Sequence, residues 1–147
     1  MFEMSLETIE TLYQLFLGAS LGALVGIERS FFKQQAGLRT FALVALGATL
    51  VSLIGAKLGL SVTAEILGPI VVGVGFIGAG LIFYAEDKLV GVTTASAIWV
   101  TAVIGAAVGQ KLYLEAFFVT FLAIIVLSVL PLIEQRMTSS RSQPPPA

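Results

Sequence analysis

The residues of this 147-residue chain that could do chemistry gather in a few short stretches. Glu28 and Arg29 are adjacent, and Arg39 follows in the same short charged segment. A carboxylate and a guanidinium can form a charge-assisted hydrogen-bonded pair, which gains strength where it is partly desolvated at a membrane boundary. Glu86 and Asp87 form an acidic pair, a weak candidate for a Mg²⁺ or Ca²⁺ site because these ions prefer oxygen ligands. Such a pair more often solvates a loop.

A third polar stretch is "EDKLVGVTTASAIWVT". Thr93 or Thr94 can cap a helix by accepting hydrogen bonds from exposed backbone N–H groups. Together with Ser96 and Trp99 they could instead line a cavity facing the cytoplasm, between the start of this helix, the end of the preceding helix and the Glu28 corner. A helix N-terminus there would favour an anion. Both interpretations stay open, and the cap with interhelical hydrogen bonds is favoured.

Several classes of function are excluded by composition. The chain has no cysteine and no histidine, so it lacks thiolate metal sites, cysteine nucleophiles and Ser-His pairs. Its net charge of −1 provides no basic field for nucleic acid. We therefore expect no enzymatic activity, no cofactor and no nucleic-acid partner.

The elements that position these residues are predicted by the charge pattern. Charged residues make up only 12% of the chain, against about 25% in soluble domains, and 57% of its residues are hydrophobic. Five uncharged runs are long enough for transmembrane helices, and they do not alternate as barrel strands would. The runs are residues 11–27, 40–56, 66–85, 89–110 and 116–133. We predict an all-α integral membrane bundle over residues 1–134, with a disordered cytoplasmic tail at 135–147.

Orientation follows from the distribution of basic residues. Six of them fall on one side of five spans, and only Lys57 and Lys111 fall on the other. The six are Arg29, Lys33, Arg39, Lys88, Arg136 and Arg141. Because cytoplasmic loops collect Lys and Arg, the N-terminus is predicted outside and the C-terminus in the cytoplasm. The start of the chain is acidic, so no cleaved signal peptide is expected.

Small residues indicate where the helices pack, since they let backbones approach closely in lipid. Gly18, Gly22 and Gly26 mark one face, and a ladder of Thr93, Ala97, Thr101, Gly105 and Gly109 marks another. The run 66–85 has Gly73 and Gly80 on one side and Gly75 and Gly78 nearly opposite. This two-sided pattern predicts a central third helix. The bulky run 116–133 is predicted at the periphery, and the glycine faces left over predict a homodimer.

The chain resembles the membrane domain of the MgtC/SapB family. The resemblance is carried by "LGALVGIERSFFKQQAGLRTFALVALGATL", "GVGFIGAGLIF" and "VGVTTASAIWVTAVIG", in the family's order and spacing. It implies a bacterial inner-membrane protein, from a family associated with virulence, low-magnesium growth and the regulation of membrane proteins such as the rotary ATP synthase. The family's charged corner maps onto Glu28, Arg29 and Arg39, and its polar helix entry onto Thr93 and Thr94. Many relatives continue into a cytosolic domain, so this chain is expected to be the membrane core alone.

Two functions remain. The first is a non-enzymatic regulator that binds other membrane proteins or itself within the lipid bilayer. The second is a channel or carrier for Mg²⁺ or another small solute. Ion-moving proteins commonly keep an ionisable group inside a span, and no charged residue is expected there in this chain. The abundance of packing glycines also favours the regulator.

Overall fold

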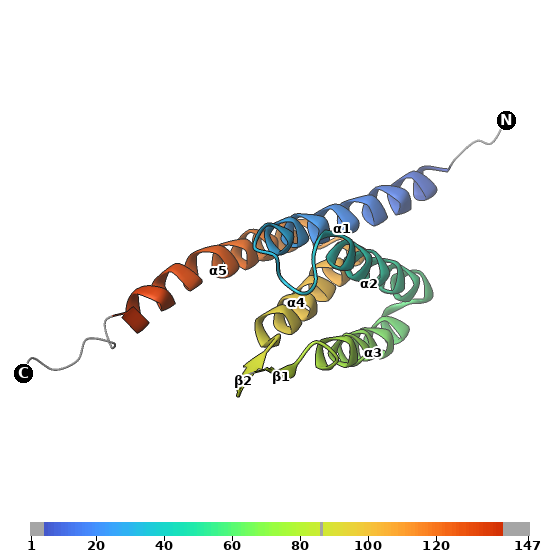
Figure 1. Ribbon diagram of the computed structural model, residues 1–147. Coiled ribbons are helices and arrows are strands. Elements are labelled where there is room, and N and C mark those ends of the chain that lie inside the picture. The colour runs from blue at the N-terminus through green and yellow to red at the C-terminus, as the bar shows by residue number, and fades with distance from the viewer. Residues whose placement is uncertain (1–4, 86, 140–147) are drawn as a thin grey trace, which may run out of the picture.

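Five long helices and one short hairpin make up the computed structural model, which describes residues 5–85 and 87–139 (Figure 1). The helices are α1 (Leu6–Phe31), α2 (Leu38–Leu58), α3 (Leu60–Ala79), α4 (Val92–Gly109) and α5 (Tyr113–Ser139). Strands β1 (Phe83–Ala85) and β2 (Lys88–Val90) pair antiparallel between α3 and α4. All five helices are long and apolar enough to cross a membrane, so the predicted all-α membrane bundle is confirmed.

Two helix boundaries differ from the prediction. The third helix occupies Leu60–Ala79 instead of 66–85, and the hairpin takes up the residues after it. The charge pattern placed its start too late because Glu65 lies within the helix, exposed on its outer side. The last helix continues to Ser139, so residues 135–139 are helical where a tail was expected. Residues 140–147, the rest of the predicted tail, lie outside the described residues.

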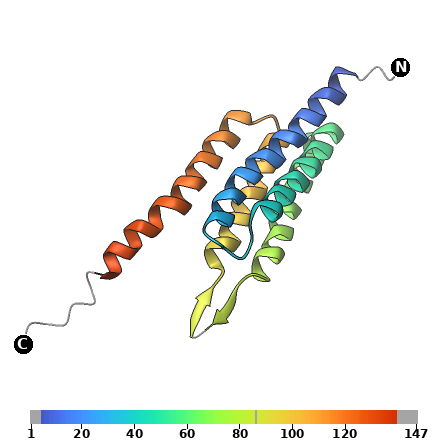
Figure 2. The same cartoon turned by 45° about the horizontal axis from the view of Figure 1, so that its top comes forward.

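The central helix is α4, and the prediction of a central third helix is wrong. Helix α4 packs against all four other helices, whereas α3 packs only against α2 and α4. Accordingly, 56% of the α4 span is buried, against 11% of the α3 span. Helix α5 is peripheral, as predicted, and its C-terminal half stands away from the other helices in both views (Figure 2).

Glycines bring the backbones of α1, α2 and α4 into close contact, as their spacing predicted. A Cβ atom added at Gly22 would lie 2.5 Å from the Phe41 carbonyl oxygen, and one at Gly26 would lie 2.7 Å from Leu38 Cα. At Gly18 an added Cβ would collide with the Thr49 hydroxyl. In the α4 ladder Ala97, Thr101, Gly105 and Gly109 are buried, whereas Thr93 is exposed. These contacts are the dense part of the bundle.

The glycines of α3 behave differently from this. Nothing in the described chain lies within 4 Å of a Cβ added at Gly68, Gly73 or Gly75. Gly78 makes an ordinary contact with Ala95, and Gly80 meets only its own helix. The two-sided glycine pattern was therefore misread, because most of these glycines face away from the bundle. The predicted packing role of Gly73 and Gly75 is not realised within one chain.

Hydrogen bonds between helices supplement the glycine contacts. In α2, the Thr49 hydroxyl donates to the Gly105 carbonyl at 2.9 Å and the Ser52 hydroxyl to the Ala106 carbonyl at 2.8 Å. From α1, the buried Gln14 amide donates to the Val108 carbonyl at 2.9 Å. No fully buried side-chain nitrogen or oxygen in the described part of the chain lacks a partner. Such satisfaction is required where no water is present.

The end of the bundle at the start of α1 carries two exposed ion pairs. Lys57 lies 3.1 Å from Glu7, and Lys111 lies 2.7 Å from Glu10. The hydrogen bond and charge of Glu10 raise the pKa of Lys111. Exposed pairs contribute little to stability, so these four side chains mainly mark one rim of the spanning region. The hairpin and the loop of residues 32–37 lie at the opposite rim (Figure 2).

Candidate functional site

A buried ion pair lies in the last turn of α1. Arg29 donates from Nε to Glu28 Oε2 at 2.5 Å and from Nη2 to Glu28 Oε1 at 2.8 Å. The two residues are only 4% and 9% exposed, Arg29 being the more buried. This two-point arrangement is the strongest form of a guanidinium–carboxylate bond, and it offsets part of the cost of removing both charges from water.

Arg39 is not part of this pair. It lies exposed at the start of α2, whereas Glu28 and Arg29 are buried. The two helix ends are neighbours, as expected, because the Leu38 backbone N–H donates to the Ser30 hydroxyl at 2.9 Å. The predicted three-residue corner is therefore reduced to the pair within α1, and Arg39 contributes positive charge to the adjacent rim.

Helix α5 supplies the other side of the site. The Ser128 hydroxyl donates to Glu28 Oε1 at 3.4 Å, and Arg29 Nη2 donates to the Leu127 carbonyl at 3.5 Å. In an uninterrupted helix that carbonyl would accept from the backbone N–H of residue 131, but Pro131 has none. Arg29 therefore satisfies a carbonyl that the proline leaves free. We call Glu28, Arg29, Ser128 and the Leu127 carbonyl the charged corner.

Sequence reasoning missed the contribution of α5, although a signal was present. The proline inside the last apolar run implies a free carbonyl four residues earlier, at Leu127. A free carbonyl in a membrane helix requires a donor from elsewhere. Gln14 and Thr49 were missed in the same way, since each is a polar side chain inside an apolar run and each donates to α4.

A Pro131→Ala variant is expected to stabilise α5, because the new N–H can donate to the Leu127 carbonyl within the helix. Removing proline from a helix interior can contribute up to about 3 kcal/mol, and less near a helix end. Thermal unfolding in detergent measures the gain. Ser128→Ala, which leaves the backbone unchanged, is the matched control and is expected to be neutral or slightly destabilising. An unchanged or lowered midpoint for Pro131→Ala would contradict the role given to Arg29.

The start of α4 is built by a glycine, not by a threonine cap. Gly91 is the N-cap residue, has φ of +93°, and makes no side-chain cap bond. The left-handed turn is needed where β2 leads into α4, and a Cβ there would collide with the Leu81 carbonyl. The prediction that Thr93 or Thr94 caps α4 is therefore wrong. Thr94 is buried, Thr93 is exposed, and Ser96 donates to the Val92 carbonyl at 2.9 Å.

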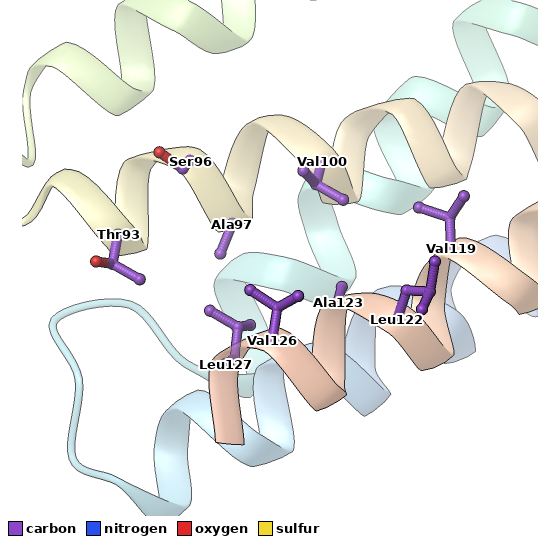
Figure 3. Close-up of a pocket in the computed structure, with 9 residues that line it drawn as sticks. All are labelled: Thr93, Ser96, Ala97, Val100, Val119, Leu122, Ala123, Val126 and Leu127. Atoms are coloured by element: carbon purple, nitrogen blue, oxygen red, sulfur yellow. The ribbon is translucent and has the colours of Figure 1, made fainter. Parts of the chain in front are cut away.

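A groove of about 290 Å³ runs between α4 and α5, and we call it the α4–α5 groove. Figure 3 shows Thr93 and Leu127 near one end and Val100 and Val119 near the other. Its lining residues are Thr93, Ser96, Ala97, Val100, Val119, Leu122, Ala123, Val126 and Leu127. The groove thus ends next to the charged corner, since Leu127 belongs to both.

The expected cavity beside the start of α4 is therefore divided in two. One part is the α4–α5 groove, which the prediction did not foresee because it assigned the wall to the third helix. The other is a groove between α3 and α4 that includes Gly78, Ser96 and Trp99. Trp99 lies at this wall and is partly exposed, as one of its two predicted positions required.

The acidic pair of the hairpin is not seen as a metal site. No group of three or more acidic, histidine or cysteine side chains in residues 5–85 and 87–139 could hold a metal ion. Asp87 occupies the hairpin turn with φ of +60°, a conformation that aspartate tolerates better than most residues. Glu86 lies outside the described residues.

Five spanning helices around a glycine-packed centre, with one ion pair buried against α5, define a multi-pass helical membrane protein. The chain belongs to the MgtC family, whose profile matches residues 15–136. It is therefore a multi-pass bacterial membrane protein, as the sequence predicted.

Similar proteins come from distant bacteria. The chain is 35% identical to the "Putative magnesium transporter YhiD" of Escherichia coli K12, over 83% of this chain and 61% of that protein. It is 32% identical to protein SrpB of Synechococcus elongatus (79% and 72%) and 40% identical to protein MgtC of Brucella abortus (78% and 49%). The chain thus spans only 61% and 49% of the length of YhiD and the Brucella MgtC. No solved structure gives a significant match.

Proposed function

We propose that this protein is a non-enzymatic regulator of other membrane proteins and binds a transmembrane helix of its partner on the outer face of α3. The observation that supports this most directly is that Gly68, Gly73 and Gly75 contact nothing in the chain. Glycines in the other helices are used for close packing, so α3 carries the same kind of surface without an occupant.

The shape of this face suits a helix. Val72 and Phe76 project from it, 75% and 85% exposed. A groove of about 390 Å³ between α2 and α3 runs beside it, with Gly47 and Gly73 among its lining residues. Projecting side chains next to glycine gaps allow a neighbouring helix to interdigitate at close backbone distance, the main source of helix association in lipid.

A link to magnesium homeostasis or low-magnesium adaptation is part of the proposal. It is supported by membership of the MgtC family and by the printed name of YhiD, a relative of which this chain covers 61%. We place the protein in the inner membrane with its N-terminus outside, because loop 32–37 and the hairpin carry Lys33, Arg39 and Lys88 at one rim.

A carrier for Mg²⁺ or another small solute is the second candidate, and one observation favours it. Glu28 and Arg29 are buried inside the spanning helix α1, so the expectation that no charge lies inside a span is wrong. Buried ionisable groups often mark ion pathways. The carboxylate is, however, already bonded to Arg29 and Ser128, which supports an anchoring role instead.

Magnesium uptake into proteoliposomes of the purified protein separates the two candidates. The regulator is expected to give no uptake above empty vesicles. Saturable uptake that a Glu28→Gln variant abolishes, while the variant still folds, would establish the carrier instead.

A Gly75→Leu variant is expected to abolish growth support in low magnesium, in a strain that lacks its own family member. The variant should insert and unfold like the wild type, because nothing in the chain lies near Gly75. Ala56→Leu, at an exposed position of α2, is the matched control and should grow normally. Equal growth of the two variants would refute the α3 surface. A crosslink from Val72 to a second copy would replace the foreign partner with a homodimer.

A further inference from the structure

The guanidinium of Arg29 has one edge that the protein does not use. Arginine has five N–H donors, two on each terminal nitrogen and one on Nε. Nε and Nη2 donate to Glu28 and to the Leu127 carbonyl, while Nη1 has no hydrogen bond to any described residue. Every fully buried side-chain nitrogen of the described residues has a partner, so Nη1 must reach the surface. A side chain that is otherwise 95% buried thus keeps an open donor edge.

This edge lies next to the end of the α4–α5 groove. Arg29 Nη2 contacts the carbonyl of Leu127, and the side chain of Leu127 closes one end of the groove, opposite Thr93 (Figure 3). From there the groove runs along both helices within their spanning segments, between aliphatic side chains such as Val100 and Leu122. One end is therefore polar and cationic, and the rest is apolar.

The surface around the polar end is also positive. Loop 32–37 adjoins the start of α4, because an added Cβ at Gly91 would lie 3.0 Å from the side-chain oxygen of Gln35. Lys33 in this loop and Arg39 just after it are exposed and have no ion-pair partner in the described part of the chain. The same loop is bonded to the charged corner through the Gln34 N–H, which donates to the Arg29 carbonyl at 2.9 Å.

We propose that the α4–α5 groove binds an anionic phospholipid, with one acyl chain between α4 and α5 and the phosphate at Arg29 Nη1. Guanidinium edges match phosphate oxygens in geometry and charge, and basic residues near the surface attract anionic lipids. The groove, of about 290 Å³, is at the lower end of small-ligand sites of about 300–1,000 Å³. It suits a single chain better than a helix roughly 10 Å across. This site is separate from the α3 surface and does not depend on the regulator proposal.

The test is native mass spectrometry of the whole protein in detergent with either phosphatidylglycerol or phosphatidylcholine. We expect one phosphatidylglycerol to remain bound and phosphatidylcholine to bind much more weakly. An Ala123→Phe variant, which fills the groove, should lose this lipid. Ala64→Phe, at an exposed position of α3, should keep it. Retention of the lipid by Ala123→Phe, or equal binding of the two lipids by the wild type, would overturn the proposal.

A second variant keeps the test decisive if Ala123→Phe does not fold. Lys33→Gln combined with Arg39→Gln changes only exposed side chains, so folding should be preserved. We expect it to weaken phosphatidylglycerol binding roughly tenfold or more and to leave phosphatidylcholine binding unchanged. No change in either affinity would refute the cationic end of the site. A wild-type dimer without lipid, disrupted by filling the groove, would assign the groove to a second copy and also refute the proposal.

Discussion

A Glu28→Ala variant is expected to lose about 3–5 kcal/mol of folding free energy, because it leaves the Arg29 guanidinium buried without its counter-ion. Arg29 is only 4% exposed and receives two of its hydrogen bonds from this carboxylate. Ser128 would also lose its acceptor. Denaturant or thermal unfolding in detergent measures the loss, and membrane insertion should persist because the remaining basic residues still orient the chain.

The matched control replaces both members of the pair. Glu28→Leu combined with Arg29→Met removes both charges while keeping side-chain volume, and such double replacements are often nearly neutral. Here one cost remains, since the Leu127 carbonyl loses its donor, at about 1–3 kcal/mol. The double variant should therefore be more stable than Glu28→Ala. If it is equally unstable, the side chains act through packing and the ion-pair account is wrong.

A Gly105→Ala variant is expected to destabilise the bundle by about 1–3 kcal/mol or more, through overpacking. The added Cβ would collide with the Ala45 carbonyl oxygen and lie 2.9 Å from Ala45 Cα, so α2 and α4 must separate. The separation also lengthens the bond from the Thr49 hydroxyl to the Gly105 carbonyl. Unfolding in detergent, compared with the wild type, is the measurement.

Gly47→Ala is the control for this experiment and should change stability in the opposite direction. Gly47 is also inside a helix, but nothing lies within 4 Å of an added Cβ there. Alanine is favoured over glycine in a helix interior by up to about 1 kcal/mol. If both substitutions stabilise or both destabilise, backbone contact does not explain the difference between the two glycines.

The number and kind of elements could be predicted because lipid imposes a simple rule on the sequence. Charges are excluded from most of each span, so the uncharged runs identified five helices. The rule failed at Glu65, which faces outward in α3 near its start, and the predicted third helix was displaced towards the hairpin. A residue's exposure depends on its neighbours in space, which charge spacing does not reveal.

The candidate site was predicted only in part, for a similar reason. Adjacent residues such as Glu28 and Arg29 can be recognised as a pair from the sequence alone. Their contact with Ser128 joins residues 100 positions apart, and no periodicity within either helix encodes it. Glycine spacing likewise identified close-packing faces but not which of them are occupied, so the faces of α3 and α4 were given the wrong ranks.

The hydrogen bond from Gln14 to Val108 has a consequence for biosynthesis. Donor and acceptor are 94 residues apart, and the first helix leaves the ribosome long before the fourth. Until α4 arrives, the Gln14 amide has no acceptor there, so the nascent α1–α2 hairpin holds an incomplete polar contact. Translation must continue past Gly109 before the membrane-embedded centre can close, which makes the fourth helix the step that commits the chain to its final assembly.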